Sequence, residues 1–324
     1  MSTLSTKVTD EELTTGIKDE FGVVYSADGK RLLKCENDKI EQYEIKDGTK
    51  VICDDAFVWC EALQQIVIPN SINSIGKSAF YCCKSLQQII IPHYVTHIDS
   101  NPFAYCKRIN IKSESNQFVV QDKMLIDTKE SRLITYFGHK LSVHIPNTIT
   151  KVGDSAFLNC NSIRKVCFTN SVTDIGEYAF RDCESLQQLS FSNSLISIGE
   201  SAFSRCISLQ QIVIPNSVTK ISDGAFNMCD SLQQILISDS VTSIGNLAFS
   251  YCHSLQQITI PDSVIKIGET AFIGCDSLKH IIIPEGRAEK FIKMLPAYVL
   301  DKVYCIKKAY TDEQIAERRK DLPF

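Results

Sequence analysis

The apolar residues of this chain recur with a period of 23 residues. The clearest copy of the pattern occupies residues 198–220, and the same order of residue types starts again at Ile221. Each copy is marked by an Ala-Phe pair, or by Pro-Phe in one case. The marked phenylalanines are Phe57, Phe80, Phe103, Phe157, Phe180, Phe203, Phe226, Phe249 and Phe272. Such a period indicates a solenoid, in which stacked repeats bury together what no single repeat can bury alone.

Each repeat holds two extended runs. In residues 209–215 the pattern L-x-x-L-x-L predicts a strand with Leu209, Ile212 and Ile214 pointing inward. Gln211 and Val213 then point outward, because side chains alternate across a strand. The proline that follows ends this strand, since it cannot donate to a ladder of hydrogen bonds.

The rest of the repeat turns the chain back. A second, shorter extended run ends at Ile221, and in most copies a glycine follows at this place, which predicts a tight backbone turn. The pair Ala202-Phe203 predicts a short helical or 3-10 turn. We expect the phenylalanines to stack in the core.

The first 50 residues precede the repeats and are expected to close one end. Thr9 can cap a short helix that starts at Asp10, with Glu12 as its capping-box partner. Residues 23–33 form two apolar runs around Asp28-Gly29, which predicts a β-hairpin. A cap is needed because an uncovered terminal coil exposes strand edges and core.

The repeats extend over residues 51–286, with an irregular coil at about 107–150. Residues 125–134 resemble the first hairpin at an offset of 101, which indicates an internal duplication. After the repeats, residues 287–306 are expected to form a C-terminal cap, with a helix that ends at Pro296. Residues 307–324 form a charged tail for which we expect a loose helix or disorder.

The repeated phrase I-G-x-x-A-F-x-x-C-x-S-L-Q-Q-I-x-I-P-x-S-V-T-x resembles the BspA-like leucine-rich repeat family. This resemblance implies a leucine-rich repeat solenoid of the α/β, β-rich class. Its parallel strands would line the concave side of a right-handed curved coil. The resemblance also implies a microbial protein, often located on the cell surface and used in adhesion or in binding host proteins.

Charge and the lengths of apolar runs bear on the class of partner and on the location of the protein. The net charge is about -4 and no basic stripe is present, which argues against a nucleic-acid partner. No apolar run reaches the roughly 18 residues of a membrane span. The N-terminus lacks a signal-peptide pattern, which favours a cytoplasmic location, or the cell surface or secretion if a leader was removed.

Nine of the 14 cysteines hold the same place in successive repeats. One cysteine per coil predicts buried free thiols that act as small apolar residues. Zinc would need paired CxxC motifs or Cys/His clusters, which the spacing does not give. The nine are Cys60, Cys83, Cys106, Cys160, Cys183, Cys206, Cys229, Cys252 and Cys275.

The outward strand positions are the candidate partner-binding surface, here called the strand face. It combines a row of glutamines with a largely apolar row, and exposed apolar patches mark interaction sites. A structural interpretation stays open beside it, in which stacked Gln amides hydrogen-bond between coils. The candidate residues are Gln65, Val67, Gln88, Ile90, Gln188, Ser190, Gln211, Val213, Gln234, Leu236, Gln257, Thr259, His280 and Ile282.

No motif predicts chemistry. The close histidine pairs, at 93 and 97 and at 139 and 144, lack other ligands at metal-binding spacing. A row of acidic residues follows the glycine position, but single spaced carboxylates favour a solvated face over a calcium site. These acidic residues are Asp154, Glu177, Glu200, Asp223 and Glu269. We therefore expect no catalytic residues, no metal and no cofactor.

The sequence predicts a monomeric, non-enzymatic scaffold that binds a protein partner of unknown identity on the strand face. The alternative is a secreted or cell-surface adhesin that binds a host or matrix protein. An enzyme assembled from scattered residues is the third and least favoured class.

Overall fold

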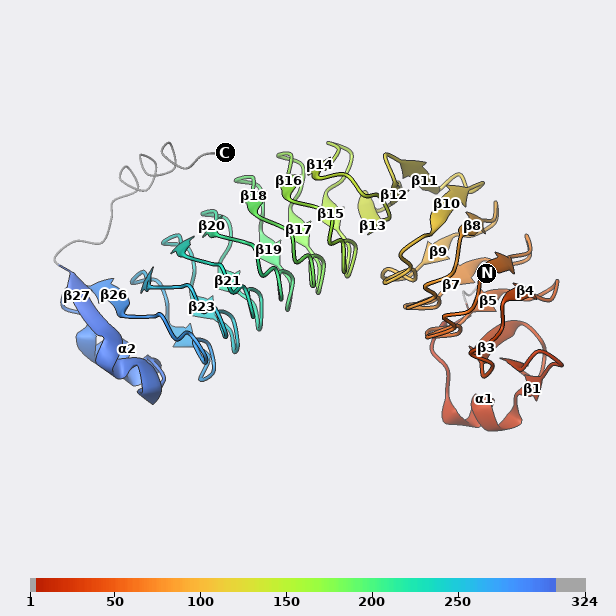
Figure 1. The fold of residues 1–324 in the computed structure, drawn as a ribbon, viewed down its shortest axis with the longest axis horizontal. Coiled ribbons are helices and arrows are strands. Elements are labelled where there is room, and N and C mark those ends of the chain that lie inside the picture. Colours follow the sequence, from red (N-terminus) through yellow and green to blue (C-terminus); the bar gives the residue numbers. More distant parts are fainter. Residues whose placement is uncertain (1–3, 307–324) are drawn as a thin grey trace. The chain divides into compact units, whose positions relative to one another are not determined.

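The computed structural model describes residues 4–306 of the chain (Figure 1). Its contacts define two compact units. Among the described residues, unit 1 consists of residues 4–138 and 151–159, and unit 2 consists of residues 139–150 and 160–306. The predicted charged tail at 307–324 lies outside the described residues.

Unit 1 is built from coils that each contain one longer and one two-residue strand. The longer strands pair in parallel in the order β10-β8-β6-β4. They are β4 (Gln42–Glu44), β6 (Gln65–Val67), β8 (Gln88–Ile91) and β10 (Asn110–Ser113). The two-residue strands are β5 (Val51–Ile52), β7 (Ser74–Ile75), β9 (His97–Ile98) and β15 (Lys151–Val152).

Unit 2 repeats this design, and its paired strands are in register. Gln211 pairs with Gln234, for example, 23 residues later. The longer strands are β14 (Ser142–His144), β16 (Lys165–Cys167), β18 (Gln188–Ser190), β20 (Gln211–Val213), β22 (Gln234–Leu236), β24 (Gln257–Thr259), β26 (His280–Pro284) and β27 (Val303–Ile306). The short strands are β17 (Asp174–Ile175), β19 (Ser197–Ile198), β21 (Lys220–Ile221), β23 (Ser243–Ile244) and β25 (Lys266–Ile267). The longer strands are divided into the groups β14-β16-β18, β20-β22 and β24-β26-β27. The predicted solenoid with parallel strands is confirmed.

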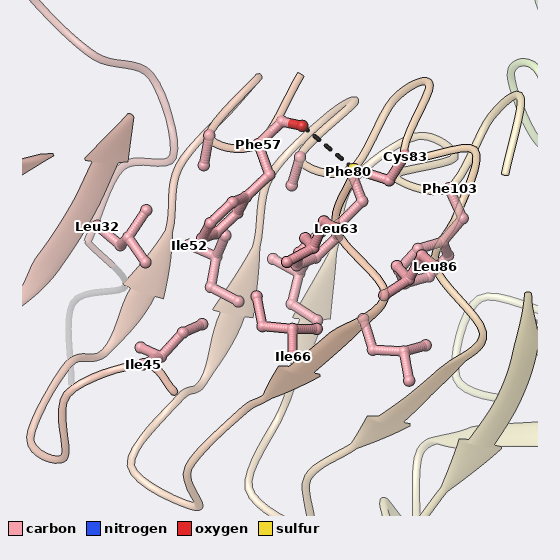
Figure 2. Close-up of a cluster of buried hydrophobic side chains, with 14 of the residues drawn as sticks. Leu32, Ile45, Ile52, Phe57, Leu63, Ile66, Phe80, Cys83, Leu86 and Phe103 are labelled. Atoms are coloured by element: carbon pink, nitrogen blue, oxygen red, sulfur yellow. Dashed lines mark hydrogen bonds between the residues drawn. The ribbon is translucent and has the colours of Figure 1, made fainter. Parts of the chain in front are cut away.

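The phenylalanines stack along the core, as the repeat predicted (Figure 2). In unit 1 the rings of Phe57, Phe80 and Phe103 follow one another at centroid distances of 5.4 and 5.7 Å. In unit 2 the five rings from Phe180 to Phe272 are 5.1 to 6.0 Å apart and tilted by at most 12°. Every marked phenylalanine is at most 3% exposed. Burial of one Phe side chain contributes roughly 1.5–3 kcal/mol, so this stack is a main source of stability.

The repeated cysteines are free thiols, and most of them are buried. They also make a contact that the sequence did not reveal. The Cys83 thiol donates a hydrogen bond to the Phe57 carbonyl of the preceding coil, at 3.2 Å (Figure 2). The thiols of Cys229 and Cys252 repeat this contact with the carbonyls of Phe203 and Phe226, both at 3.3 Å. The repeated cysteine therefore fills core space and also gives a second hydrogen bond to a buried carbonyl, which already accepts the backbone N–H of the cysteine in its own coil.

The turn at the Ala-Phe pair is not helical, and that prediction was wrong. Two residues with left-handed backbone, Ser201 (φ 51°) and Arg205 (φ 61°), flank Phe203. The N–H groups of these three residues donate to the next coil, at 2.8 to 2.9 Å. The intervening N–H groups donate three residues back along the turn. A helix does not form because half of the backbone N–H groups in this turn donate to the neighbouring coil and not within the turn.

The repeated glycine has a different role from the predicted tight turn. Gly199 and Gly245 are absent from the left-handed region. A Cβ atom on Gly245 would lie 2.3 Å from Asp223 Oδ1 and 2.6 Å from Asp223 N, in the preceding coil. The glycine is required because two backbones approach closely there.

Both predicted hairpins are present, and each gains a third strand. The first cap contains α1 (Asp10–Thr15), β1 (Ile17–Lys18), β2 (Val23–Tyr25) and β3 (Arg31–Cys35), and the Thr9–Glu12 capping box is formed. The second contains β11 (Phe118–Gln121), β12 (Met124–Asp127) and β13 (Arg132–Tyr136). Both sets are antiparallel, with a register shift at matching places.

Matching arginines fix the two hairpins. Arg132 Nη2 donates to the carbonyl of Ile98, in the coil before its hairpin, at 2.8 Å. Arg31 Nη2 donates to the carbonyl of Lys7 at 2.6 Å, and its guanidinium also pairs with Glu12. The N-terminal segment therefore takes the place of a preceding coil.

The C-terminal end of the repeats is covered as predicted by a helix that stops before Pro296. The covering elements are α2 (Ala288–Met294) and the 3-10 helix η1 (Ala297–Lys302). They contact β26 and bury Phe291, Leu295 and Val299. Strand β27, which the sequence did not predict, then adds to β26 in parallel.

Candidate partner-binding surface

The strand face lies on the outer side of the longer strands, in two separate groups. In unit 1, Gln65, Val67, Gln88 and Ile90 are exposed. In unit 2 the group runs from Gln188 on β18 to Ile282 on β26. There the glutamines of β18, β22 and β24 are exposed and the other members are half-buried. The alternation is as predicted, since Leu209, Ile212 and Ile214 are at most 2% exposed.

The glutamine amides of the strand face are available for a partner. Within residues 4–306, the side chains of the six strand glutamines make no hydrogen bond to the protein. The ladder of amide hydrogen bonds between coils, which was the structural interpretation of these residues, is therefore not formed. Each amide keeps two donors and an acceptor directed away from the core. The six are Gln65, Gln88, Gln188, Gln211, Gln234 and Gln257.

The strand face of unit 2 has an uncharged centre. Strands β18, β20, β22 and β24 present only Gln, Ser, Val, Leu and Thr outward. Lys165 on β16 precedes this stretch. His280 follows it on β26, and its ring meets the ring of Tyr304 on β27 edge to face at 4.4 Å. The β-branched and aromatic run at 303–306 was the sequence signal for this covering strand.

Unit 1 carries an exposed aromatic group that the sequence analysis missed. The ring of Tyr81 lies edge to face between those of Trp59 and Tyr105, at 5.6 and 5.2 Å. Trp59 is 54% exposed. Lys84 Nζ lies 5.9 Å from the Trp59 ring and forms a 2.6 Å ion pair with Glu61. The signal in the sequence was aromatic residues one or two positions after the repeat phenylalanine.

The other candidates for chemistry remain dispersed. Within the described residues, His, Cys, Asp and Glu side chains do not gather in any group of three or more that could hold a metal ion. Asp223, from the acidic row, accepts a hydrogen bond from the Asn246 N–H of the next coil at 3.1 Å. Burial raises the pKa of the Cys275 thiol to about 11, which keeps it protonated and weakens it as a metal ligand.

Helices are few and short. Among those in residues 4–306, none has the length and apolar character needed to cross a membrane.

A family model described as BspA type leucine rich repeat region (6 copies) matches residues 34–140, 137–256 and 220–314. Repeat proteins of this kind are typically non-enzymatic. No curated protein matches the chain.

Solved structures of bacterial repeat proteins share the fold. A leucine rich cell surface protein from Faecalibacterium prausnitzii is 30% identical, with a TM-score of 0.62 over 81% of this chain and 63% of that protein. The pneumococcal vaccine antigen PcpA is 19% identical, with a TM-score of 0.69 over 83% and 69% of the two chains. A leucine-rich repeat protein from Eubacterium ventriosum is 18% identical, with a TM-score of 0.54 over 81% and 92%.

These relatives bear on location and role. The matched part of this chain corresponds to less than two thirds of the Faecalibacterium protein. That protein is described as a cell surface protein, and nothing in the comparisons supports the predicted cytoplasmic location. The family and these structures are consistent with a role in protein interaction or adhesion.

Proposed function

Because the chain belongs to the BspA-type leucine-rich repeat proteins, we propose that it is a binding protein that holds a protein partner on its strand face. The observation that carries this proposal is the row of unbonded glutamine amides beside apolar side chains. A partner can satisfy these amides while it covers Val213 and Leu236, and such pairing of polar and apolar contacts is typical of interfaces.

We further propose that the protein works at the cell surface or outside the cell, as an adhesin. The cell-surface relative from Faecalibacterium favours this location. Labelling of intact cells of the source organism with a membrane-impermeant reagent or a specific antibody tests it. Labelling only after the cells are lysed would contradict the proposal.

The strand face is tested by charge reversal of its apolar row. Val213→Glu with Leu236→Glu places two carboxylates where a partner would desolvate them, and burial of unpaired charge is costly. We expect partner recovery to fall at least tenfold in a pull-down from the native cell or its host.

A matched control changes two exposed apolar residues of the same unit that lie beside the short strands. Ile196 and Ile265 are 58% and 70% exposed, and both become Glu in this control. Partner recovery should match that of the unmodified protein. Equal recovery by both folded double variants would rule out the strand face as the binding surface.

A further inference from the structure

The last coil of unit 2 has an open edge at its short strand. Strand β25 pairs with β23 on one side, and within the described residues no strand pairs with its other side. The cap covers this coil elsewhere, because β27 pairs with β26 and the Phe272 N–H donates to the Tyr298 hydroxyl at 3.3 Å. The edge of β25 therefore faces a space that the cap does not fill.

The space beside this edge is a cavity of about 570 Å³ between the last coil and the cap. Ile265, Ile267 and Glu269 lie on one wall, and residues 293–298 of the cap lie on the other. The volume is within the roughly 300–1,000 Å³ of typical ligand pockets. We propose that the cavity binds an extended segment of a partner chain, which pairs in parallel with β25 and carries a glycine opposite Glu269.

The backbone of the open edge selects an extended chain. In the preceding coil, the Thr242 carbonyl accepts the Ile265 N–H and the Ile244 carbonyl accepts the Gly268 N–H, both at 2.8 Å. The equivalent carbonyls of the last coil belong to Ile265 and Ile267, and they accept no hydrogen bond from residues 4–306. Two acceptors in line require donors and do not attract an anion. An extended segment supplies N–H groups at this spacing, as in other cases where a peptide adds a strand to a sheet edge.

The same geometry sets a requirement for glycine in the partner segment. A Cβ atom on Gly245 would lie 2.6 Å from Asp223 N, and one on Gly268 would lie 2.5 Å from Asn246 N, in each case in the preceding coil. Glu269 is the corresponding residue of the last coil, and it lines the cavity. A segment that takes the place of the next short strand meets the backbone of Glu269 at this point. Only glycine allows two backbones to approach so closely.

The walls of the cavity favour apolar side chains on the segment. Ile265 is 70% exposed, at the place where the two preceding coils carry Thr219 and Thr242. Met294 lies on the cap wall. A second copy of this chain is less suited, since a cavity of this size does not take in a folded coil. A short edge strand that carries a lysine, here Lys266, also discourages pairing between copies.

The test uses the full chain and a peptide with the sequence of residues 238–247, which include a short strand and the glycine of the repeat. The peptide carries a fluorescent label, and its anisotropy is followed as the chain is added. We expect saturable binding. Two variant peptides carry Gly245→Val, which introduces the clash with Glu269, or Thr242→Pro, which removes the N–H that would donate to the Ile265 carbonyl. Each should bind at least tenfold more weakly.

Matched variants of the protein locate the site. Ile265→Glu places a carboxylate on the cavity wall and should weaken binding of the peptide at least tenfold. Ile196→Glu changes the same residue type at the same place of an earlier coil, where it is 58% exposed, and should leave the affinity unchanged. Circular dichroism and thermal unfolding establish that both variants are folded. Val213→Glu/Leu236→Glu should also bind the peptide normally, because the cavity is separate from the strand face.

Several outcomes would overturn the inference. It is wrong if the peptide does not bind, if the valine and proline peptides bind as well as the parent peptide, or if Ile196→Glu weakens binding as much as Ile265→Glu. It is also wrong if the full chain forms a dimer that Ile265→Glu disrupts, because the occupant would then be a second copy. None of these results bears on the strand face, so the proposed function stands or falls separately.

Discussion

In one turn of the repeat, the glycine is not the residue with left-handed backbone. Gly245 lies outside that region, and Leu247, two residues later, lies in it. Gly245 lies against the backbone of the preceding coil, whereas Leu247 has a left-handed backbone (φ 55°) and is 41% exposed. The sequence shows a glycine at this place in most copies. The reason for it could not be predicted, because the distance between the backbones of neighbouring coils exists only after stacking.

Loss of the glycine should therefore lower the free energy of unfolding although Gly245 is not in the left-handed region. Introduction of a glycine at Leu247 should not lower it. Gly245→Ala forces its Cβ onto Asp223 and should lower the free energy of unfolding by about 1–3 kcal/mol, as overpacking does. Leu247→Gly relieves a conformation that costs about 1–2 kcal/mol but adds chain entropy of about 0.5–1 kcal/mol, so it should be neutral or slightly stabilising. Urea unfolding of both variants measures the difference. A more stable Gly245→Ala protein would refute the close-approach explanation.

The buried thiol of Cys275 predicts a pH dependence of stability. Its pKa in the folded protein is raised, mainly by burial, to about 11, against about 8.5 in an unfolded chain. The stabilisation is fully present below pH 8.5 and is lost as the pH rises towards 11, because only the unfolded chain then releases the proton. The slope is up to about 1.4 kcal/mol per pH unit. Cys275→Ala should flatten the fall in unfolding free energy between pH 9 and 11, and identical slopes would contradict the assignment.

At the scale of elements, the 23-residue period predicts the two strands of each coil well, because each strand meets its equivalent in the next coil. The strands that were missed lie before residue 51, after residue 286 or in the irregular coil at about 107–150, and they are β1, β4, β10, β11 and β27. β1 has only two residues, and its pairing with β2 depends on the hairpin being formed first. The prediction of a helical turn at Ala202-Phe203 was wrong because alternate N–H groups of this turn, Phe203 N–H among them, bond to the next coil, which no local pattern reveals.

The phenylalanine stack is the element whose loss should cost most. Phe226 is fully buried between the rings of Phe203 and Phe249, at 5.5 and 5.8 Å. Phe226→Ala leaves a cavity between two coils and should lower the free energy of unfolding by about 3–5 kcal/mol. Phe226→Leu, which keeps most of the volume, should cost less. A loss below about 1 kcal/mol for the alanine variant in a denaturant melt would show that the stack is not a source of stability.

At the scale of the whole molecule, the repetition explains why the fold could be predicted from the sequence and why the hydrogen bonding of the strand glutamines could not. Fold and strand-face positions followed from the pattern, because every copy applies the same inside and outside alternation. The state of the Gln211 amide did not follow, since a ladder of stacked amides and a row of unbonded amides have the same sequence. The partner that we propose stays unidentified for a related reason. Fixed residues of the repeat build the coil, and in our proposal variable outward residues such as Val213 and Leu236 recognise the other molecule.

A repeat protein also has ends, and the C-terminal end gives a prediction for the molecule as a whole. Removal of α2, η1 and β27 by truncation after Gly286 uncovers the edge of β26 and the apolar residues that packed on Phe291, Leu295 and Val299. Exposed strand edges and core pair with other chains. The truncated protein should therefore associate or precipitate. A control that ends after Ile306 keeps every described element and should scatter light as a monomer, as should the 36.3 kDa full chain. A monomeric truncated protein that keeps its thermal midpoint would show that the coils need no cap at this end.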